Sequence, residues 1–125
     1  MEKKKKICVI SGNPVTSRLL SALISSNGFH VHHACFSIDE INNLKNDGPR
    51  PDVVIYDIAE PQIGGTGVCE LIERFTISKI TPKIIISSFE IDCTECFERQ
   101  ESKCAHFLKP WRGKELLGKI SEFAN

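Results

Sequence analysis

One carboxylate in this sequence stands where a parallel-sheet protein would do chemistry. Asp57 ends the apolar run 53–56, and a loop containing Pro61, Gly64 and Gly65 follows it closely. An unbroken apolar run of this kind is typical of a strand buried on both faces of a parallel sheet. Ligands and reactive groups collect at the carboxyl ends of such strands. Asp57 is therefore a candidate reactive group, although an aspartate at the start of a loop also commonly caps a turn.

Two more strand ends carry polar side chains. Ser87 follows the apolar run 83–86, and Lys109 follows the short run 105–108. If these runs are neighbouring parallel strands, a carboxylate, a hydroxyl and an ammonium group meet in one cleft. These groups suit an acyl phosphate, with Asp57 as the acceptor and the other two binding the phosphoryl oxygens through a hydrogen bond and a charge.

The elements that would position these residues alternate along the chain. Apolar runs predict strands at 7–10, 53–56, 83–86 and 105–108, the more polar run 29–33 predicts a weaker strand, and a helix is expected after each. Such alternation predicts an α/β fold, a five-stranded parallel sheet with helices on both faces. Right-handed crossovers and a flavodoxin-like, doubly wound strand order 2-1-3-4-5 bring the ends of strands 1, 3, 4 and 5 together. The polar run 29–33 is expected at a sheet edge.

The sequence marks the expected helices to different degrees. The first follows Pro14 and ends at Asn27-Gly28. Its apolar face is expected to consist of Val15, Leu19, Leu20, Leu23 and Ile24. A capping box of Ser37 and Glu40 opens the second. The third is expected at about 66–78 and the fourth, which has few apolar anchors, at 90–102. The last is expected to pack through Leu116, Leu117, Ile120 and Phe123.

Length and charge limit the classes of protein to consider. The 125 residues are expected to form a single domain, 1–125, with residues 1–5 as a basic lead-in. Sixteen basic residues balance sixteen acidic ones, so direct binding to nucleic acid or to a membrane surface is not expected. No apolar stretch is long enough for a transmembrane helix, and no apolar signal region follows the basic start. The expected location is the cytoplasm.

Six cysteines raise the questions of disulfides and of a metal site. With no secretory signal and enough residues to build a core, the chain is not expected to need disulfides. Cys93-x-x-Cys96, together with Cys104 and His106, is the arrangement that suggests zinc. It lacks the second closely spaced pair of common zinc modules, so two unrelated pairs are the favoured interpretation and zinc is the alternative.

Taken together, these features resemble a response-regulator receiver domain, the phosphoacceptor module of two-component and phosphorelay signalling. The resemblance covers roughly residues 6–123. The strand sequence PDVVIYDI places Asp57 at the phosphoacceptor position, and Pro61 and Gly65 follow in the next loop. Ser87 stands at the Ser/Thr switch position. Lys109-Pro110 follows the fifth strand, and this peptide bond is usually cis in the family.

The resemblance implies a mechanism and partners. A histidine kinase or phosphotransfer protein would donate a phosphoryl group to Asp57, with Mg²⁺ neutralising charge in the transition state. Ser87 would then bind a phosphoryl oxygen, and the residue at the reporting aromatic position, here His106, would move. A downstream protein would bind the face of the fourth helix, fifth strand and fifth helix. On this face the resemblance places Phe97, His106, Phe107 and Trp111. Beyond self-catalysed phosphotransfer, no enzymatic activity is expected.

The expected magnesium site departs from the family pattern. Ser11 and Gly12 replace the acidic pair that normally follows the first strand. Mg²⁺ prefers carboxylate oxygens and loses its water reluctantly, so it would depend mainly on Asp57 and a backbone oxygen at Ala59. The additional weak donors are Ser11, Asn13 and Glu60. A weakened or lost magnesium site is therefore expected.

Several alternatives remain open at this stage. Without the acidic pair, the chain is also compatible with a phosphorylation-independent, pseudo-receiver module that acts through protein interactions. A remoter alternative is a flavodoxin-like domain that binds a phosphate or a flavin through loop 11–17. One Trp, one Tyr and no loop that offers an aromatic sandwich count against a flavin. His106 is either a signalling residue or a partly exposed edge histidine. Trp111 is either a lid on the core or an exposed anchor.

Overall fold

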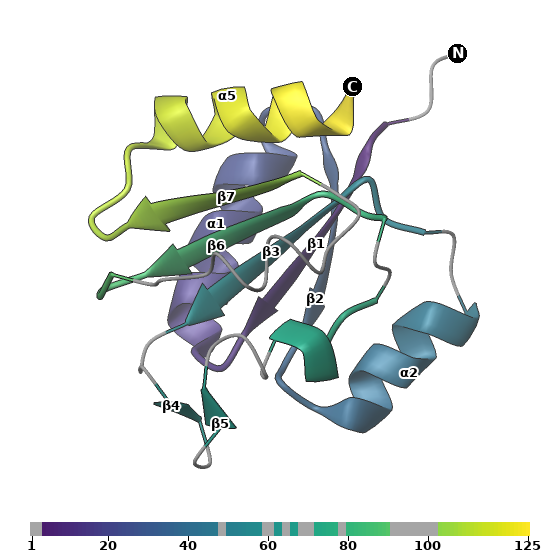
Figure 1. Cartoon of the computed structure of the whole chain (residues 1–125). Coiled ribbons are helices and arrows are strands. Elements are labelled where there is room, and N and C mark those ends of the chain that lie inside the picture. The colour runs from purple at the N-terminus through teal and green to yellow at the C-terminus, as the bar shows by residue number, and fades with distance from the viewer. Residues whose placement is uncertain are drawn as a thin grey trace.

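A central parallel sheet organises the computed structural model, which describes residues 4–47, 50–58, 62–63, 66–67, 72–77, 80–90 and 103–125 (Figure 1). The strands of the sheet are β1 (Lys6–Ser11), β2 (His30–Ala34), β3 (Val53–Ile58), β6 (Lys83–Ser87) and β7 (Cys104–Leu108). The helices with assigned bounds are α1 (Pro14–Ser25), α2 (Ile38–Asp47) and α5 (Gly113–Ala124). A short antiparallel pair, β4 (Gln62–Ile63) and β5 (Thr66–Gly67), lies outside the main sheet.

The strand order confirms the predicted topology. Within the described residues the sheet runs β2-β1-β3-β6-β7, and every neighbouring pair is parallel. This is the order 2-1-3-4-5 of a doubly wound α/β fold, with the polar strand β2 at one edge as expected. The register pairs Ser11 with Asp57 and Ile58 with Ser87. The carboxyl ends of four strands therefore meet along one edge of the sheet.

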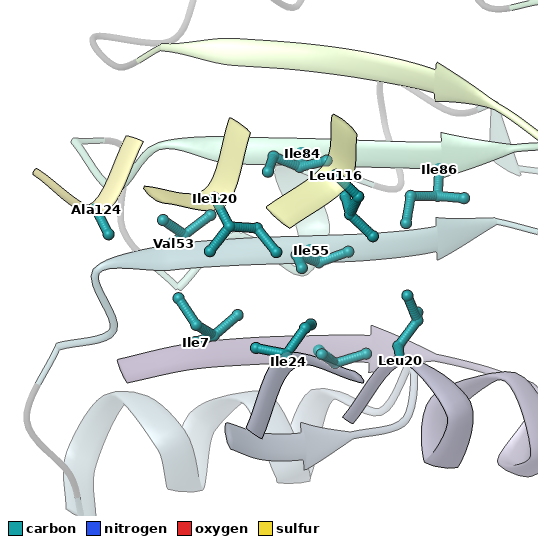
Figure 2. Close-up of a cluster of buried hydrophobic side chains, with 11 residues drawn as sticks. Ile7, Leu20, Ile24, Val53, Ile55, Ile84, Ile86, Leu116, Ile120 and Ala124 are labelled. Carbon is teal, nitrogen blue, oxygen red and sulfur yellow. The ribbon is translucent and has the colours of Figure 1, made fainter. Parts of the chain in front are cut away.

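Helices α1 and α5 cover one face of the sheet. Leu20 and Ile24 from α1, and Leu116 and Ile120 from α5, meet the aliphatic side chains of β1, β3 and β6 in one buried cluster (Figure 2). Continuous apolar runs in these strands supply buried side chains to both faces, as expected for the interior of a parallel sheet. Trp111 is half-buried and packs against this cluster, so it acts as a lid on the core rather than as an exposed anchor.

Helix α2 and the helical residues 72–74 lie on the opposite face, with α5 and α2 on opposite sides of the sheet in Figure 1. Ile41 from α2 and Ile72 pack into a second buried cluster with Tyr56 of β3. The buried Tyr56 hydroxyl donates a hydrogen bond to the Phe75 carbonyl at 3.0 Å, which satisfies its polar end. None of the described helices is both long and apolar enough to cross a bilayer.

Helix α1 turns a different face to the sheet from the predicted one. Val15 and Leu19 are 65% and 63% exposed, so their assignment to the core is wrong. The buried side chains of α1 are Ser17, Leu20, Ser21 and Ile24. The two serine hydroxyls lie 2.8 Å and 3.1 Å from His33 Nδ1 on β2. These hydrogen bonds satisfy small polar groups under the helix, and the small side chains let α1 pack closely against the edge strand.

The prediction of a helix from residue 66 is also wrong at its start. Thr66–Gly67 forms β5 and pairs with β4, and helical structure is described only at 72–74. Gly64 and Gly65 separate β4 from β5 in the sequence, a two-residue spacing typical of a hairpin. The expected fourth helix falls almost entirely on residues 91–102, which lie outside the described residues, as does Phe97.

Candidate functional site

Asp57 lies in β3 at the edge where the strand ends meet. It is buried, with 2% of its surface exposed. The register of β1 against β3 places Ser11 directly opposite, and the Ser11 hydroxyl donates a hydrogen bond of 2.8 Å to Asp57 Oδ2. A carboxylate withdrawn from water needs such donors and a counter-charge.

Lys109 supplies the counter-charge. Its Nζ lies 2.8 Å from Asp57 Oδ1, and its side chain is 27% exposed. The contact is an ion pair without the alignment of a hydrogen bond, since Oδ1 has no hydrogen-bond partner among the residues that the structure describes. The Lys109-Pro110 peptide bond is cis, and the Lys109 amide donates to the Ser87 carbonyl at 2.7 Å. The start of this loop is therefore held against the end of β6.

The Ser11 loop uses its own oxygens to begin α1. Asn13 is the N-cap: its Oδ1 accepts hydrogen bonds from the amides of Val15 at 2.9 Å and Thr16 at 3.2 Å. The Asn13 amide in turn donates to the Ser11 hydroxyl oxygen at 3.1 Å. Both neutral side-chain oxygens of this loop are thus engaged in local structure.

The described residues do not fit a magnesium ion. Mg²⁺ requires oxygen ligands in octahedral geometry and is held mainly by carboxylates. Asp57 has one oxygen on Ser11 and the other beside the Lys109 ammonium, whose positive charge opposes a bound cation. Ala59 and Glu60, the other donors considered, lie outside the described residues.

Ser87 reaches the same edge but its hydroxyl contacts other groups. Ser87 Oγ lies 2.5 Å from the Phe89 carbonyl oxygen and 2.7 Å from His106 Nε2. Along β6, Ser87 is in phase with Ile85, which belongs to the α2 side of the sheet. The structure therefore brings Ser11 and Lys109 into direct contact with Asp57. The Ser87 hydroxyl is instead hydrogen-bonded to His106 and to the Phe89 carbonyl.

His106 is half-buried on β7, opposite Ile85 in the register of β6 and β7. Burial lowers the pKa of His106 below its ordinary value, and the nearby Glu90 carboxylate acts in the opposite direction. Its ring is therefore mainly neutral near pH 7. The hydrogen bond to Ser87 links this ring directly to the switch-position hydroxyl.

Two contacts of the cleft escaped sequence reasoning. The sequence suggests Ser11 only as a weak metal donor, whereas in the structure its hydroxyl is hydrogen-bonded to Asp57. The signal that could have found this contact is the equal distance of each residue from the start of its apolar run, which sets their register. The Ser87–His106 hydrogen bond depends on side-chain direction and had no comparable signal in the sequence.

The cysteines are only partly described. Cys8, Cys35 and Cys104 are free thiols, and burial raises the pKa of Cys8 to about 12. Among the described residues, no group of three or more His, Cys, Asp and Glu side chains is arranged to hold a metal ion. Cys93 and Cys96 of the zinc alternative lie outside them.

Sequence comparison finds related proteins in other organisms. The chain is 27% identical to Protein PilG of Pseudomonas aeruginosa over 115 residues, which covers 92% of this chain and 84% of PilG. It is 25% identical over 120 residues to the probable transcriptional regulator ycf27 of Guillardia theta, which covers 96% of this chain and 45% of that protein. The chain thus spans most of PilG but about half of ycf27. No family model matches the chain.

Comparison with solved structures finds the same fold. The receiver domain protein (CheY-like) from Methanospirillum hungatei has a TM-score of 0.74 at 16% identity, with 98% of this chain and 94% of that chain covered. CheY4 of Vibrio cholerae has a TM-score of 0.74 at 15% identity over 97% and 99%. TrrA of Thermotoga maritima, solved in complex with Mg(2+)-BeF, has a TM-score of 0.70 at 20% identity over 95% and 98%.

Proposed function

We propose that the chain is a response-regulator receiver domain and that Asp57 is its phosphoacceptor in a two-component or phosphorelay pathway. The observation that supports this most directly is the buried Asp57 carboxylate, held between the Ser11 hydroxyl and the Lys109 ammonium at the carboxyl ends of adjacent strands. An aspartate that only capped a turn would need neither a counter-charge nor a position at the carboxyl ends of adjacent strands.

The transfer would come from a phosphohistidine of a histidine kinase or phosphotransfer protein. An Asp57 oxygen attacks phosphorus, the N–P bond breaks, and its electron pair returns to the imidazole nitrogen, which takes up a proton. Lys109, already 2.8 Å from the carboxylate, would neutralise charge on the phosphoryl oxygens. Any catalysis by the chain itself is limited to this self-directed phosphotransfer.

We propose that the magnesium site is weakened or lost. TrrA was solved with Mg(2+)-BeF, but the described donors of this chain are a single carboxylate and two neutral oxygens already used in hydrogen bonds. Phosphotransfer that relies on a divalent cation should accordingly be slow, since such a cation is worth several kcal/mol of charge stabilisation.

The test is phosphorylation by acetyl phosphate with Mg²⁺, followed by intact-mass analysis. The matched control is Asp57→Asn, which keeps the side-chain volume; Asp57→Ala is the second control. The expected result is slow, incomplete addition of one phosphoryl group to the native chain and none to either variant. Equal labelling of Asp57→Asn would contradict the assignment of the acceptor, and rapid stoichiometric labelling of the native chain would contradict the weakened metal site.

One observation favours a second candidate, a phosphorylation-independent interaction module. Ser11 and Lys109 already engage both Asp57 oxygens, so the cleft is closed around its own carboxylate. No labelling of the native chain by acetyl phosphate or by a phosphotransfer partner, together with unchanged partner binding by Asp57→Asn, would favour this candidate.

The partner surface is proposed to include the start of α1. Val15 and Leu19 project from this helix one turn apart, and α1 begins three residues after Ser11. An apolar helix face of a phosphotransfer protein could pack there and still reach Asp57. A downstream protein would use the face of β7 and α5, where Leu108 is exposed.

A further inference from the structure

A cavity of about 430 Å³ lies between α2 and the strands β1 and β2, at the edge of the sheet. The strand side chains that line it are small or polar: Cys8 of β1, and His32 and Ala34 of β2, with Cys8 directly opposite His32 in the register. Among the residues of α2, only Ile41 is fully buried. Short side chains on the strands and a single buried side chain on the helix therefore leave the space between them unfilled.

The cavity joins an apolar interior to a charged rim. Leu44 of α2 and Ile77 add aliphatic side chains to its lining, and Lys6 lines it on the side of the sheet. Lys6 is half-buried, and among the described residues its ammonium group forms no ion pair. The volume falls in the range of small-molecule sites, which are about 300–1,000 Å³, mostly apolar, and supplied with a few polar groups.

We infer that this cavity binds a small organic acid, with its apolar body between Leu44 and Ile77 and its carboxylate at the Lys6 ammonium. A carboxylate gives the half-buried ammonium the counter-charge that the described residues do not supply. The apolar body of the acid would fill space that is otherwise left between helix and sheet.

Two other titratable side chains on the rim are compatible with an acid. Glu40 is negatively charged, but its Oε2 accepts a hydrogen bond of 2.8 Å from the Cys35 amide, which holds the carboxylate at the start of α2. Burial and the neighbouring histidine and lysine side chains lower the pKa of His32. Its ring is therefore mainly neutral near pH 7 and has one N–H to donate to a ligand oxygen.

The inference goes beyond the proposed phosphoacceptor role and does not depend on it. None of Ser11, Asp57 and Lys109 lines the cavity. A ligand in the cavity would connect α2 to β1 and β2, and it would stabilise the folded domain by mass action.

The probe is 2-naphthoate, a carboxylate on two fused rings, titrated into the ¹⁵N-labelled chain and followed by ¹H–¹⁵N correlation spectra. The expected result is saturable shifts of the amide signals of Cys8, Ala34 and Leu44, with a Kd of about 1 mM or lower, as expected for a ligand of this size. Uncharged 2-naphthamide should bind roughly 2- to 5-fold more weakly, because it lacks the ion pair. Absence of saturable shifts would overturn the inference without bearing on Asp57.

Two lysine substitutions test the contact with the carboxylate. Lys6→Met should weaken binding of 2-naphthoate by roughly 2- to 5-fold and leave binding of 2-naphthamide unchanged. Lys5→Met is the matched control, since it removes the same charge from the exposed neighbouring residue, which does not line the cavity. It should bind like the native chain. Equal effects of the two substitutions would overturn the selection of an acid by Lys6.

Two filling substitutions test the location. Ala34→Leu places a larger side chain in the cavity, and Asn43→Phe does so from an exposed position of α2 that tolerates substitution. Each should weaken binding by roughly 5-fold or more, because the ligand would have to enter an overfilled space. Unchanged affinity in both would overturn the cavity as the binding site. Asp57→Asn should bind like the native chain, and loss of binding in this variant would place the ligand in the Asp57 cleft instead.

Discussion

Lys109 Nζ lies 2.8 Å from Oδ1 of Asp57, although 51 residues separate the two along the chain. The pair joins the end of β3 to the loop after β7, across the intervening strand β6. The carboxylate is buried and the ammonium partly exposed, so the pair is a structural contact as well as the proposed phosphoryl site.

Removing the cation should destabilise the fold. Lys109→Met leaves the Asp57 carboxylate buried with only the Ser11 hydroxyl as a described partner. Loss of one member of a fully buried pair costs about 3–5 kcal/mol, and the partial exposure of Lys109 reduces this to about 2 kcal/mol. Urea denaturation checks the value. In an Asp57→Asn background the same substitution should cost much less, and equal costs in both backgrounds would show that the ion pair contributes nothing.

Restoring the missing acids should create a cation site. The Ser11→Asp/Gly12→Asp variant adds two carboxylates at the end of β1, one of them at the position paired with Asp57, and their repulsion should lower the melting temperature in EDTA. Millimolar Mg²⁺ should reverse this loss and accelerate labelling by acetyl phosphate. Space is available at position 12, where a Cβ would lie 3.9 Å from Phe36 Cδ2. The control is Ser11→Ala/Gly12→Ala, which should not respond to Mg²⁺. If Mg²⁺ also fails to change the stability and the labelling of the acidic variant, then these two carboxylates are not sufficient to create a magnesium site.

The exposed and buried faces of α1 should respond differently to substitution. Leu20→Ala removes a fully buried side chain and should lower the free energy of unfolding by about 2–5 kcal/mol. Leu19→Ala, on the exposed face, should change it by less than about 0.5 kcal/mol. Parallel urea titrations compare the two. Similar losses in the free energy of unfolding from both substitutions would show that Leu19 is a core residue, as the sequence pattern predicts.

Lys83 should make stability depend on pH. It is 1% exposed, donates from Nζ to the Thr81 carbonyl at 2.9 Å, and its pKa is lowered from 10.5 to about 8, mainly by burial, with Cys104 acting in the opposite direction. Below pH 8 the amine is charged in both states, and the folded state bears the cost of burying it. Between pH 8 and 10.5 the unfolded chain binds more protons, so stability rises with pH.

The comparison of native chain and Lys83→Met isolates this effect. From pH 7.5 to 9 the native chain should gain about 1 kcal/mol relative to the variant. The comparison also cancels Cys8, whose raised pKa of about 12 removes stability from both proteins as pH rises above 9. Parallel pH profiles for the two proteins would show that Lys83 titrates normally in the folded state.

The sequence by itself determined the topology and the meeting of the strand ends. Short apolar runs that alternate with helical segments allow few arrangements other than a parallel sheet with right-handed crossovers, and in such a sheet all carboxyl ends lie along one edge. This is why Asp57 and Lys109 could be expected in one cleft before any coordinates were known. The expectation that these two residues meet needs only the order and direction of the strands, and the alternation of strand and helix patterns along the sequence indicates both.

Only the tertiary structure decided which polar group contacts which. Ser11 reaches Asp57 because the β1–β3 register sets them side by side, whereas Ser87 follows the opposite phase of its strand and meets His106. The face that α1 buries depended likewise on Ser17 and Ser21 bonding to His33 across the sheet edge. Both outcomes depend on side-chain directions and on contacts between distant segments. The sequence pattern of a single segment shows neither of these.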